Sequence, residues 1–240
     1  MIRIGTSGWV YQDWKGVLYP DDLPQRLWLE RYAENFGTVE INASFYHLPK
    51  RATFEGWRER TPPGFVFAVK ANRYITHRLK LADVEEPWQR FLEAARGLGR
   101  KLGVVLLQFP PRWHADPQRL AAFLRLIPRG LRCAFEFRDP SWFCDELYSL
   151  LRKHRAALCR SSSPSFPDAD VITAPFVYVR LHGGSSLYSS NYSDQELAVW
   201  AEALKAYRAQ GLDAYAYFNN DVSGYAVRNA RRLRELVGEG

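Results

Sequence analysis

The sequence predicts a parallel β/α barrel of eight strands, in which the helix after the sixth strand is reduced or missing. Eight short apolar segments recur along the 240 residues, and most are separated by segments whose apolar residues have helical spacing. This alternation is typical of parallel β/α folds, and the chain length suits an eight-stranded barrel. An open doubly wound sheet is the alternative, but no glycine-rich dinucleotide-binding sequence follows the first expected strand. We see no linker, and we expect a single barrel domain over residues 1–240.

Most of the expected strands are short runs rich in β-branched or aromatic residues. They cover residues 2–5, 39–42, 65–70, 104–108, 133–138, 156–158, 177–182 and 214–218. The run at 104–108 is almost continuously apolar, as in the strands of a parallel sheet that is covered on both faces.

The helices are predicted by apolar spacing and by residues that favour helix ends. Pro117 suits the first position of a helix, and Ser193 with Glu196 forms a capping box. The expected helices cover residues 23–36, 51–60, 88–98, 117–127, 146–153, 193–211 and 225–236. By contrast, residues 161–175 are rich in Ser and Pro without helical period. Residues 71–86 are expected to form a long polar loop that acts as a mobile lid.

The segment at 177–182 is apolar at its start and polar at its end. Side chains alternate between the two faces of a strand, so Tyr178, Arg180 and His182 should share one face. An Arg and a His on one face at a strand end require anionic or hydrogen-bonding partners.

Polar side chains stand at or just after the ends of most expected strands. In β/α barrels the functional groups lie at the carboxyl ends of the strands, so we expect these side chains to converge on one rim. They are Glu40, Asn42, Lys70, Gln108, Glu136, Arg138, Arg180, His182, Asn219 and Asp221. The small Ala68 and Ala134 share faces with Lys70 and Glu136, as a crowded barrel interior requires.

Structural explanations for these residues stay open. Glu136 and Arg138 could form a buried ion pair, and His182 could be a core histidine bonded to a backbone carbonyl. The run Asn219-Asn220-Asp221 could form a turn, since these residue types favour turns. The convergence of many polar residues on one predicted rim favours the functional interpretation.

Composition points to anionic partners. Lys and Arg number 33 against 26 Asp and Glu, and this net charge of +7 favours phosphates or nucleic acid as ligands. The three cysteines have no C-x-x-C spacing, so we expect a reducing, cytoplasmic location. No stretch has the length and apolarity of a signal peptide or of a membrane span.

A series of short motifs extends over nearly the whole chain. They are Gly5-Thr6-Ser7-Gly8-Trp9, Glu40-Ile41-Asn42 with Phe45-Tyr46, Ala68-Val69-Lys70 with His77, Gln108-Phe109-Pro110-Pro111, Glu136-Phe137-Arg138 with Ser141-Trp142, Arg180-Leu181-His182-Gly183 and Asn219-Asn220-Asp221. In these motifs the chain resembles the YecE-like family, also called domain of unknown function 72. The resemblance implies a TIM barrel and names no reaction. It also leads us to expect an acidic residue near the end of the sixth strand, where this chain has Arg160-Ser161-Ser162-Ser163.

The first functional hypothesis is an enzyme that acts on a nucleotide, a nucleic acid or a sugar phosphate, possible reactions being hydrolysis of a phosphate ester or phosphodiester. The expected cationic contacts to phosphate are Lys70, Arg73, Arg138 and Arg180. The other expected substrate contacts are Asn42, His77, Gln108, Asn219, Trp9, Tyr11, Tyr46 and Trp142. The expected catalytic groups are His182, which would move a proton, and Glu136, Glu40 and Asp221.

Two other functions are consistent with the sequence. A carbohydrate hydrolase or isomerase would use Glu40 and Glu136 as its carboxylate pair, although fold analogy is weak support. A non-catalytic barrel would bind nucleic acid or another ligand through the same charge. No cofactor is expected. Magnesium or manganese, held by Glu40, Glu136, His182 and Asp221, is the alternative, but the neighbouring cations would repel a metal ion.

Overall fold

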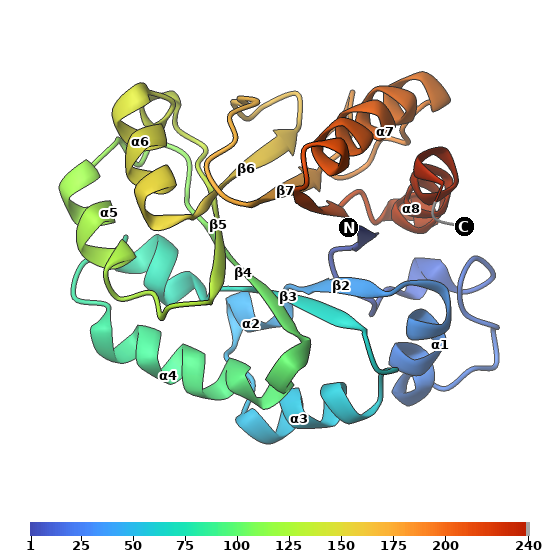
Figure 1. The fold of residues 1–240 in the computed structure, drawn as a ribbon. Coiled ribbons are helices and arrows are strands. Elements are labelled where there is room, and N and C mark those ends of the chain that lie inside the picture. The colour runs from blue at the N-terminus through green and yellow to red at the C-terminus, as the bar shows by residue number, and fades with distance from the viewer. Residues whose placement is uncertain (239–240) are drawn as a thin grey trace.

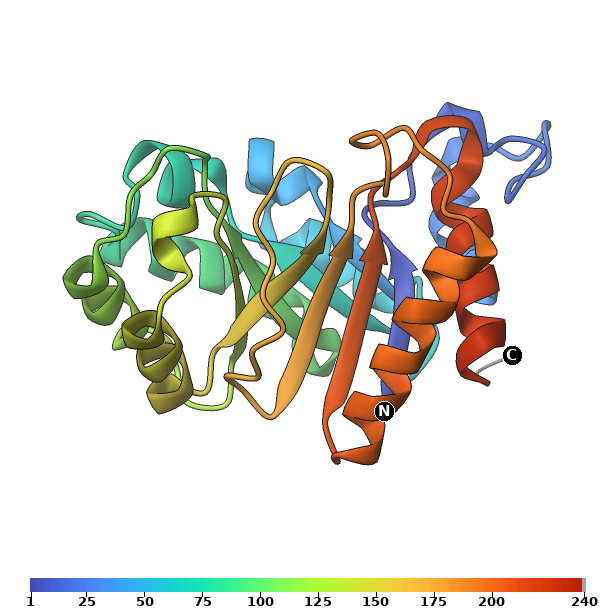
Figure 2. The same ribbon diagram turned by 90° about the horizontal axis from the view of Figure 1, so that it is seen from above.

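The computed structural model describes residues 1–238 and contains the predicted barrel. Its strands are β1 Ile2–Thr6, β2 Thr38–Ile41, β3 Val66–Lys70, β4 Leu102–Gln108, β5 Arg132–Glu136, β6 Ala157–Ser162, β7 Phe176–Leu181 and β8 Asp213–Phe218. Neighbouring strands pair in parallel in the order β1-β8-β7-β6-β5-β4-β3-β2. Their carboxyl ends therefore meet at one end of the barrel, as Figure 2 shows for β6, β7 and β8.

The α-helices lie outside the strands, except for the short α2, which lies at the carboxyl ends of the strands (Figure 1 and Figure 2). They are α1 Trp28–Asn35, α2 Ala43–Tyr46, α3 Arg51–Glu59, α4 Glu85–Ala95, α5 Pro117–Leu124, α6 Asp145–His154, α7 Asp194–Ala209 and α8 Tyr225–Val237. Pro117 is the first residue of α5, as predicted, and the Asp116 side chain caps this helix by accepting from the Arg119 amide at 3.0 Å. The predicted capping box of Ser193 and Glu196 is also present.

The connection between β6 and β7 contains no helix within the described chain, which confirms the prediction for this segment. Arg160 of β6 points to the outside of the barrel, where it forms an ion pair with Asp168 at 2.7 Å. It also donates a hydrogen bond to the Tyr207 hydroxyl of α7 at 2.8 Å. These contacts hold the irregular connection against the strands in place of a helix.

The strands β1 and β2 complete the barrel without a regular ladder. The parallel bridge found between them, in residues 1–238, joins Ser7 to Glu40, with the Gly8 amide donating to the Glu40 carbonyl at 2.7 Å. Lower down, the Tyr32 hydroxyl of α1 accepts from the Thr6 amide and donates to the Thr38 carbonyl, both at 3.0 Å. We call this junction the β1–β2 seam.

Two apolar clusters reflect the two faces of the strands. The larger cluster lies between strands and helices and contains Val177, Val179 and Leu181 of β7. The smaller cluster fills the barrel interior with Ala68, Val104, Leu106, Ala134, Ala157, Cys159, Ala174, Phe176, Tyr178, Tyr215 and Tyr217. The predicted alternation along β7 and the inward position of Ala68 and Ala134 are therefore confirmed.

The segment at 71–86 differs from the expected polar loop. Residues Tyr74–Arg78 form a π-helix, and α4 already begins at Glu85. The side chains of Ile75 and Leu81 are buried against the barrel. A few apolar residues thus anchor a largely polar stretch, and a lid opening here would have to expose them.

Within residues 1–238, no helix combines the length and apolar character that crossing a membrane requires.

Replacement of Gly5 by Ala is expected to destabilise the barrel at the β1–β2 seam. A Cβ atom at Gly5 would overlap the Thr38 carbonyl oxygen, which is backbone and has little room to move. We expect a loss of about 2 kcal/mol in the free energy of unfolding, measured by urea denaturation. The matched control is Gly56→Ala in α3, where a Cβ atom meets nothing within 4 Å and should stabilise the helix by about 0.5–1 kcal/mol. Equal effects of the two substitutions would contradict this description of the seam.

Candidate functional site

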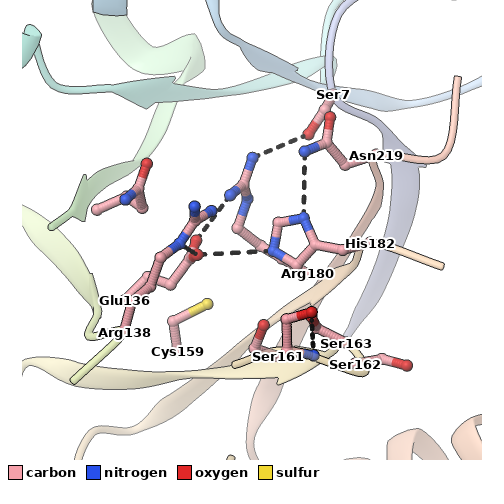
Figure 3. Close-up of polar contacts among 12 residues, drawn as sticks. Ser7, Glu136, Arg138, Cys159, Ser161, Ser162, Ser163, Arg180, His182 and Asn219 are labelled. Carbon is pink, nitrogen blue, oxygen red and sulfur yellow. Dashed lines mark hydrogen bonds and ion pairs between the residues drawn. The ribbon is translucent and has the colours of Figure 1, made fainter. Parts of the chain in front are cut away.

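Arg180 lies inside the barrel between two buried glutamates, and the three side chains are 1% exposed or less. Its Nε and Nη2 atoms donate to the two carboxylate oxygens of Glu40 on β2, at 3.0 Å and 2.8 Å. Its Nη1 atom donates to Glu136 on β5 at 2.7 Å. The ion pairs therefore connect β2, β5 and β7 across the interior. Figure 3 shows the Glu136 side of this cluster.

Further donors complete the cluster. Glu40 accepts hydrogen bonds from the Ser7 hydroxyl and from the Tyr178 hydroxyl, the latter at 2.7 Å. Glu136 accepts from Arg138 Nε at 2.8 Å. Burial opposes ionisation of both glutamates, but the Arg180 guanidinium and these donors outweigh it, so the pKa of each carboxyl lies below its ordinary value. Both glutamates are ionised and fully engaged.

His182 is sealed beneath two aromatic rings. Phe166 and Tyr188 pack edge-on against its imidazole, with ring centroids 5.8 Å and 5.5 Å away. Its Nδ1 atom accepts from Asn219 Nδ2 at 3.2 Å, which leaves the ring hydrogen on Nε2, 3.6 Å from a Glu136 oxygen. Burial and the Arg180 charge lower the pKa of His182 to about 4, so the ring is neutral at pH 7. This environment favours a core histidine over a group that exchanges protons with a substrate.

A cavity of about 430 Å³ opens at the carboxyl ends of the strands, and we call it the mouth pocket. All of its lining residues except Phe45 and Tyr188 belong to the set expected from the sequence. The lining residues are Tyr11, Asn42, Phe45, Tyr46, Lys70, His77, Gln108, Arg138, Tyr188, Asn219 and Asp221. Polar groups from most strands of the barrel therefore do converge on one rim.

Lys70 carries the least compensated charge in the mouth pocket. Its Nζ atom lies 4.0 Å from the centroid of the Phe45 ring, and within residues 1–238 no carboxylate forms an ion pair with it. Burial, assisted by the Arg180 charge, lowers the pKa of Lys70 to about 7 against the attraction of Glu136 and Glu40. An anion that binds in the pocket would therefore favour the protonated form of Lys70.

Arg138 and His77 contribute differently to the pocket. Arg138 is paired with Glu136 and lies 3.9 Å from the centroid of the Phe166 ring, so it is held in place before any ligand binds. His77 shares a hydrogen bond of 2.9 Å with the Thr76 hydroxyl, and burial together with the Lys70 charge lowers its pKa to about 4. His77 is thus a neutral hydrogen-bonding group at pH 7.

Asp221 is the carboxyl group of the mouth pocket. Its Oδ1 atom is buried and has no hydrogen-bond partner in the described chain, while the neighbouring Tyr11 hydroxyl donates to the Ser7 carbonyl at 2.6 Å. Burial raises the pKa of Asp221 to about 7, which outweighs the opposite effects of Tyr11 and Arg180. Lys70 and Asp221 therefore both change protonation near neutral pH in the same cavity.

Several predicted site residues do not line the mouth pocket. Trp142 is buried, stacks on Phe137 with centroids 4.4 Å apart, and donates to the Trp113 carbonyl, so the expectation of a ligand contact is wrong for this ring. Trp9 lines a neighbouring cavity, and Arg73 is exposed outside the lining. The remaining four lie in the barrel below the pocket: Glu40, Glu136, Arg180 and His182.

Tyr188 and Phe45 are lining residues that reasoning from the sequence missed. Tyr188 lies in the serine-rich loop after β7, with a backbone φ of 64°, and its hydroxyl accepts from Arg138 at 3.4 Å. It is the one aromatic residue between Gly183 and Ser190, which is a usable signal in a loop at the carboxyl end of a strand. Phe45 was visible only as part of a motif shared with a family.

The end of β6 supplies no carboxylate to the interior. Cys159 and Ser161 face the barrel beside Glu136 and His182 (Figure 3), whereas Arg160 faces outward. The Ser161 hydroxyl is buried without a hydrogen-bond partner in the described residues. The acidic residue expected at this strand end is therefore replaced by a small neutral side chain.

In the part of the chain that the structure describes, no three His, Cys, Asp or Glu side chains are grouped so that they could hold a metal ion. Glu40 and Glu136, the oxygen ligands considered for the alternative of a magnesium or manganese site, are bound to Arg180.

Eight parallel strands, helices outside and a polar cavity at the carboxyl ends define a TIM-like α/β barrel protein with a rim pocket. The chain belongs to the family described as "Protein of unknown function DUF72", whose sequence profile matches residues 3–240. This membership confirms the resemblance drawn from the motifs. The chain is similar to the UPF0759 protein YunF of Bacillus subtilis (strain 168), with 29% identity over 99% of this chain and 95% of that protein.

Solved structures agree with the fold. A DUF72 family protein from Thermotoga maritima is 30% identical, covers 100% of both chains and has a TM-score of 0.89. A DUF72 family protein from Enterococcus faecalis is 21% identical, with a TM-score of 0.86 over 99% of this chain and 96% of that chain. The second likeness bears on the fold alone.

Replacement of Arg180 by Met is expected to cost about 3–5 kcal/mol in the free energy of unfolding, because Glu40 and Glu136 would lose their shared counter-charge while buried. The loss should be smaller at pH 4.5 than at pH 8, since protonation relieves unpaired carboxylates. Urea denaturation at both pH values measures this. The control is Arg138→Met, which leaves Arg180 in place and should cost less. A pH-independent loss in the Arg180 variant would contradict the account.

Proposed function

We propose that this chain binds a phosphate-bearing substrate in the mouth pocket and hydrolyses a phosphate ester there. A nucleotide, a nucleic acid end or a sugar phosphate would supply the phosphate. The observation that carries the proposal is Lys70, a cation in a cavity of about 430 Å³ with no ion-pair partner among residues 1–238. A phosphate is the kind of partner that would complete its interactions.

The charges around the pocket support an anionic ligand. Glu40 and Glu136 are neutralised by Arg180 and Arg138, and neither glutamate lines the cavity. Asp221 adds little charge below neutral pH, where it is mostly protonated because its pKa is raised to about 7. The pocket therefore carries positive charge when Lys70 is protonated.

Aromatic rings at the rim support a ligand that also carries a sugar or a base. Tyr46 is 62% exposed and Tyr188 is 37% exposed, although both are large apolar rings. Both line the mouth pocket, where such rings can stack on the non-phosphate part of a ligand.

The proposed reaction uses Asp221 as the proton donor in place of His182. Water attacks phosphorus, the bond between phosphorus and the ester oxygen breaks, and Asp221 gives its proton to the departing alcohol. The attacking water then returns a proton to the carboxylate. A carboxyl group with a pKa of about 7 is matched to this work at neutral pH.

The alternatives have less support. A carbohydrate hydrolase would need Glu40 and Glu136 beside its substrate, but neither lines the mouth pocket. A barrel that binds the same anion without turnover remains the second candidate, favoured by the complete burial of His182.

Sulfate is expected to raise the melting temperature of the protein at pH 6 and to bind more weakly at pH 8.5. Lys70 loses its proton and Asp221 becomes anionic as the pH rises through about 7, and both changes remove positive charge from the pocket. Sulfate stays dianionic over this range, so the change reports the protein. Thermal shift and calorimetric titration at the two pH values measure the effect.

Two variants locate this binding. Lys70→Ala should weaken sulfate binding by about 10- to 100-fold at pH 6, the usual effect of losing a charge-assisted contact. Lys153→Ala, which removes the same charge from the exposed surface of α6, should leave binding unchanged. Equal sulfate binding by wild type and Lys70→Ala would overturn the proposal.

Asp221→Asn is expected to lower kcat by about 100-fold or more for alkyl phosphate esters, and much less for p-nitrophenyl phosphate, whose leaving group departs without a proton. Steady-state kinetics on both ester types tests the proton-donor role. A uniform loss for both esters would contradict it, and absence of turnover with intact sulfate binding would favour the non-catalytic barrel.

A further inference from the structure

A second cavity of about 260 Å³ adjoins the mouth pocket, and we call it the side pocket. Tyr11 and Asn42 line both cavities, so they form the wall between them. The other residues around the side pocket are Gly8, Trp9, Val10, Ile41, Ala43 and Trp57. The proposed phosphate site thus has an apolar annex on the side of the β1–β2 seam.

The volume and the lining of the side pocket suit an aromatic ring. Trp9 and Trp57 pack edge to face, with centroids 5.3 Å apart, and offer ring surface to the cavity. The remaining walls are Val10, Ile41 and Ala43, which provide no hydrogen bonds from their side chains. A bare sugar would leave its hydroxyl groups unpaired against such walls.

Asn42 brings an unpaired polar atom to the wall that the two cavities share. Its Oδ1 atom is buried and has no hydrogen-bond partner within residues 1–238. Asn42 precedes α2 at the capping position, yet its side chain does not cap that helix. A buried acceptor without a donor is costly, and a ligand that supplies an N–H group would satisfy it.

We propose that the side pocket binds the base of a nucleoside monophosphate unit whose phosphate lies in the mouth pocket near Lys70. The base stacks against the tryptophan side of the cavity, and a ring N–H or an exocyclic amine donates to Asn42 Oδ1. An aliphatic tail would fill the apolar space but leave this acceptor unpaired, and a sugar phosphate would leave the side pocket empty. This inference rests on the proposed function, because it places the phosphate at the same site.

The test compares ligands with and without a base. The four nucleoside 5′-monophosphates and ribose 5-phosphate are titrated into the full chain at pH 6 by calorimetry. At least one nucleotide is expected to bind about tenfold or more tightly than ribose 5-phosphate, which is the usual contribution of one stacked base. We attribute this gain in affinity over ribose 5-phosphate to binding of the base in the side pocket.

Filling the side pocket should remove this gain selectively. Ala43 is exposed and borders the side pocket alone, so Ala43→Leu occupies the space for the base without disturbing the core. We expect the nucleotide affinity to fall to that of ribose 5-phosphate, whose own affinity should not change. The matched control is Ala209→Leu at the exposed end of α7, which should retain the full gain.

The outcomes separate the two proposals. If ribose 5-phosphate binds but no base adds affinity, or if Ala43→Leu leaves the gain intact, the base site is overturned and the phosphate site survives. If neither sulfate nor ribose 5-phosphate binds, the proposed function fails and the base site fails with it. If a trinucleotide binds more than about tenfold more tightly than the corresponding monophosphate, the bound nucleotide unit is the end of a nucleic acid strand. If the two bind equally, the ligand is a free nucleotide.

Discussion

The buried guanidinium of Arg180 is the interaction on which the rest of the structure depends. A cation at this depth requires opposite charge, and Glu40 and Glu136 supply it from two other strands. Because each glutamate is also bound by further donors, the positions of the strand ends are fixed relative to one another. The same ion pairs decide the character of the mouth pocket above them. Both glutamates are engaged by arginines, so that of the two cations lining the pocket Lys70 is the one without an ion-pair partner in the described chain.

Much of the fold could be predicted because it follows from local rules. Strand alternation predicted that Arg180 and Tyr178 share one face of β7 and that Val179 lies on the other. The structure agrees, with Arg180 and Tyr178 inside the barrel and Val179 on the side of the helices. The start of α5 follows from the fixed backbone of Pro117, and the start of α7 from the Ser193 capping box. The missing helix between β6 and β7 follows from a serine- and proline-rich composition without helical period.

Reasoning from the sequence could predict which residues gather at the candidate site, but not how deeply each side chain lies in the barrel. Alternation tells which face of a strand a side chain occupies, but not whether it ends below the floor of a pocket or within it. His182 and Glu136 were therefore expected beside a substrate, although both are sealed in the barrel. The prediction for Trp142 failed for a related reason, because an aromatic side chain on a loop can point into the protein as easily as out of it. The buried Ile75 and Leu81 show how apolar side chains anchor a largely polar segment against the core.

The β1–β2 seam has a mechanical consequence. Most neighbouring strands of the barrel are joined by several backbone hydrogen bonds, whereas this junction relies on the Ser7 bridge and on the hydroxyl of Tyr32, a side chain from α1. The barrel is therefore a curled sheet whose two edge strands are joined by a few contacts, rather than a cylinder bonded equally at every strand junction. A molecule bound between the loops that follow β1 and β2 would add contacts across this junction. Ligand binding in that cleft and the rigidity of the whole barrel would therefore increase together.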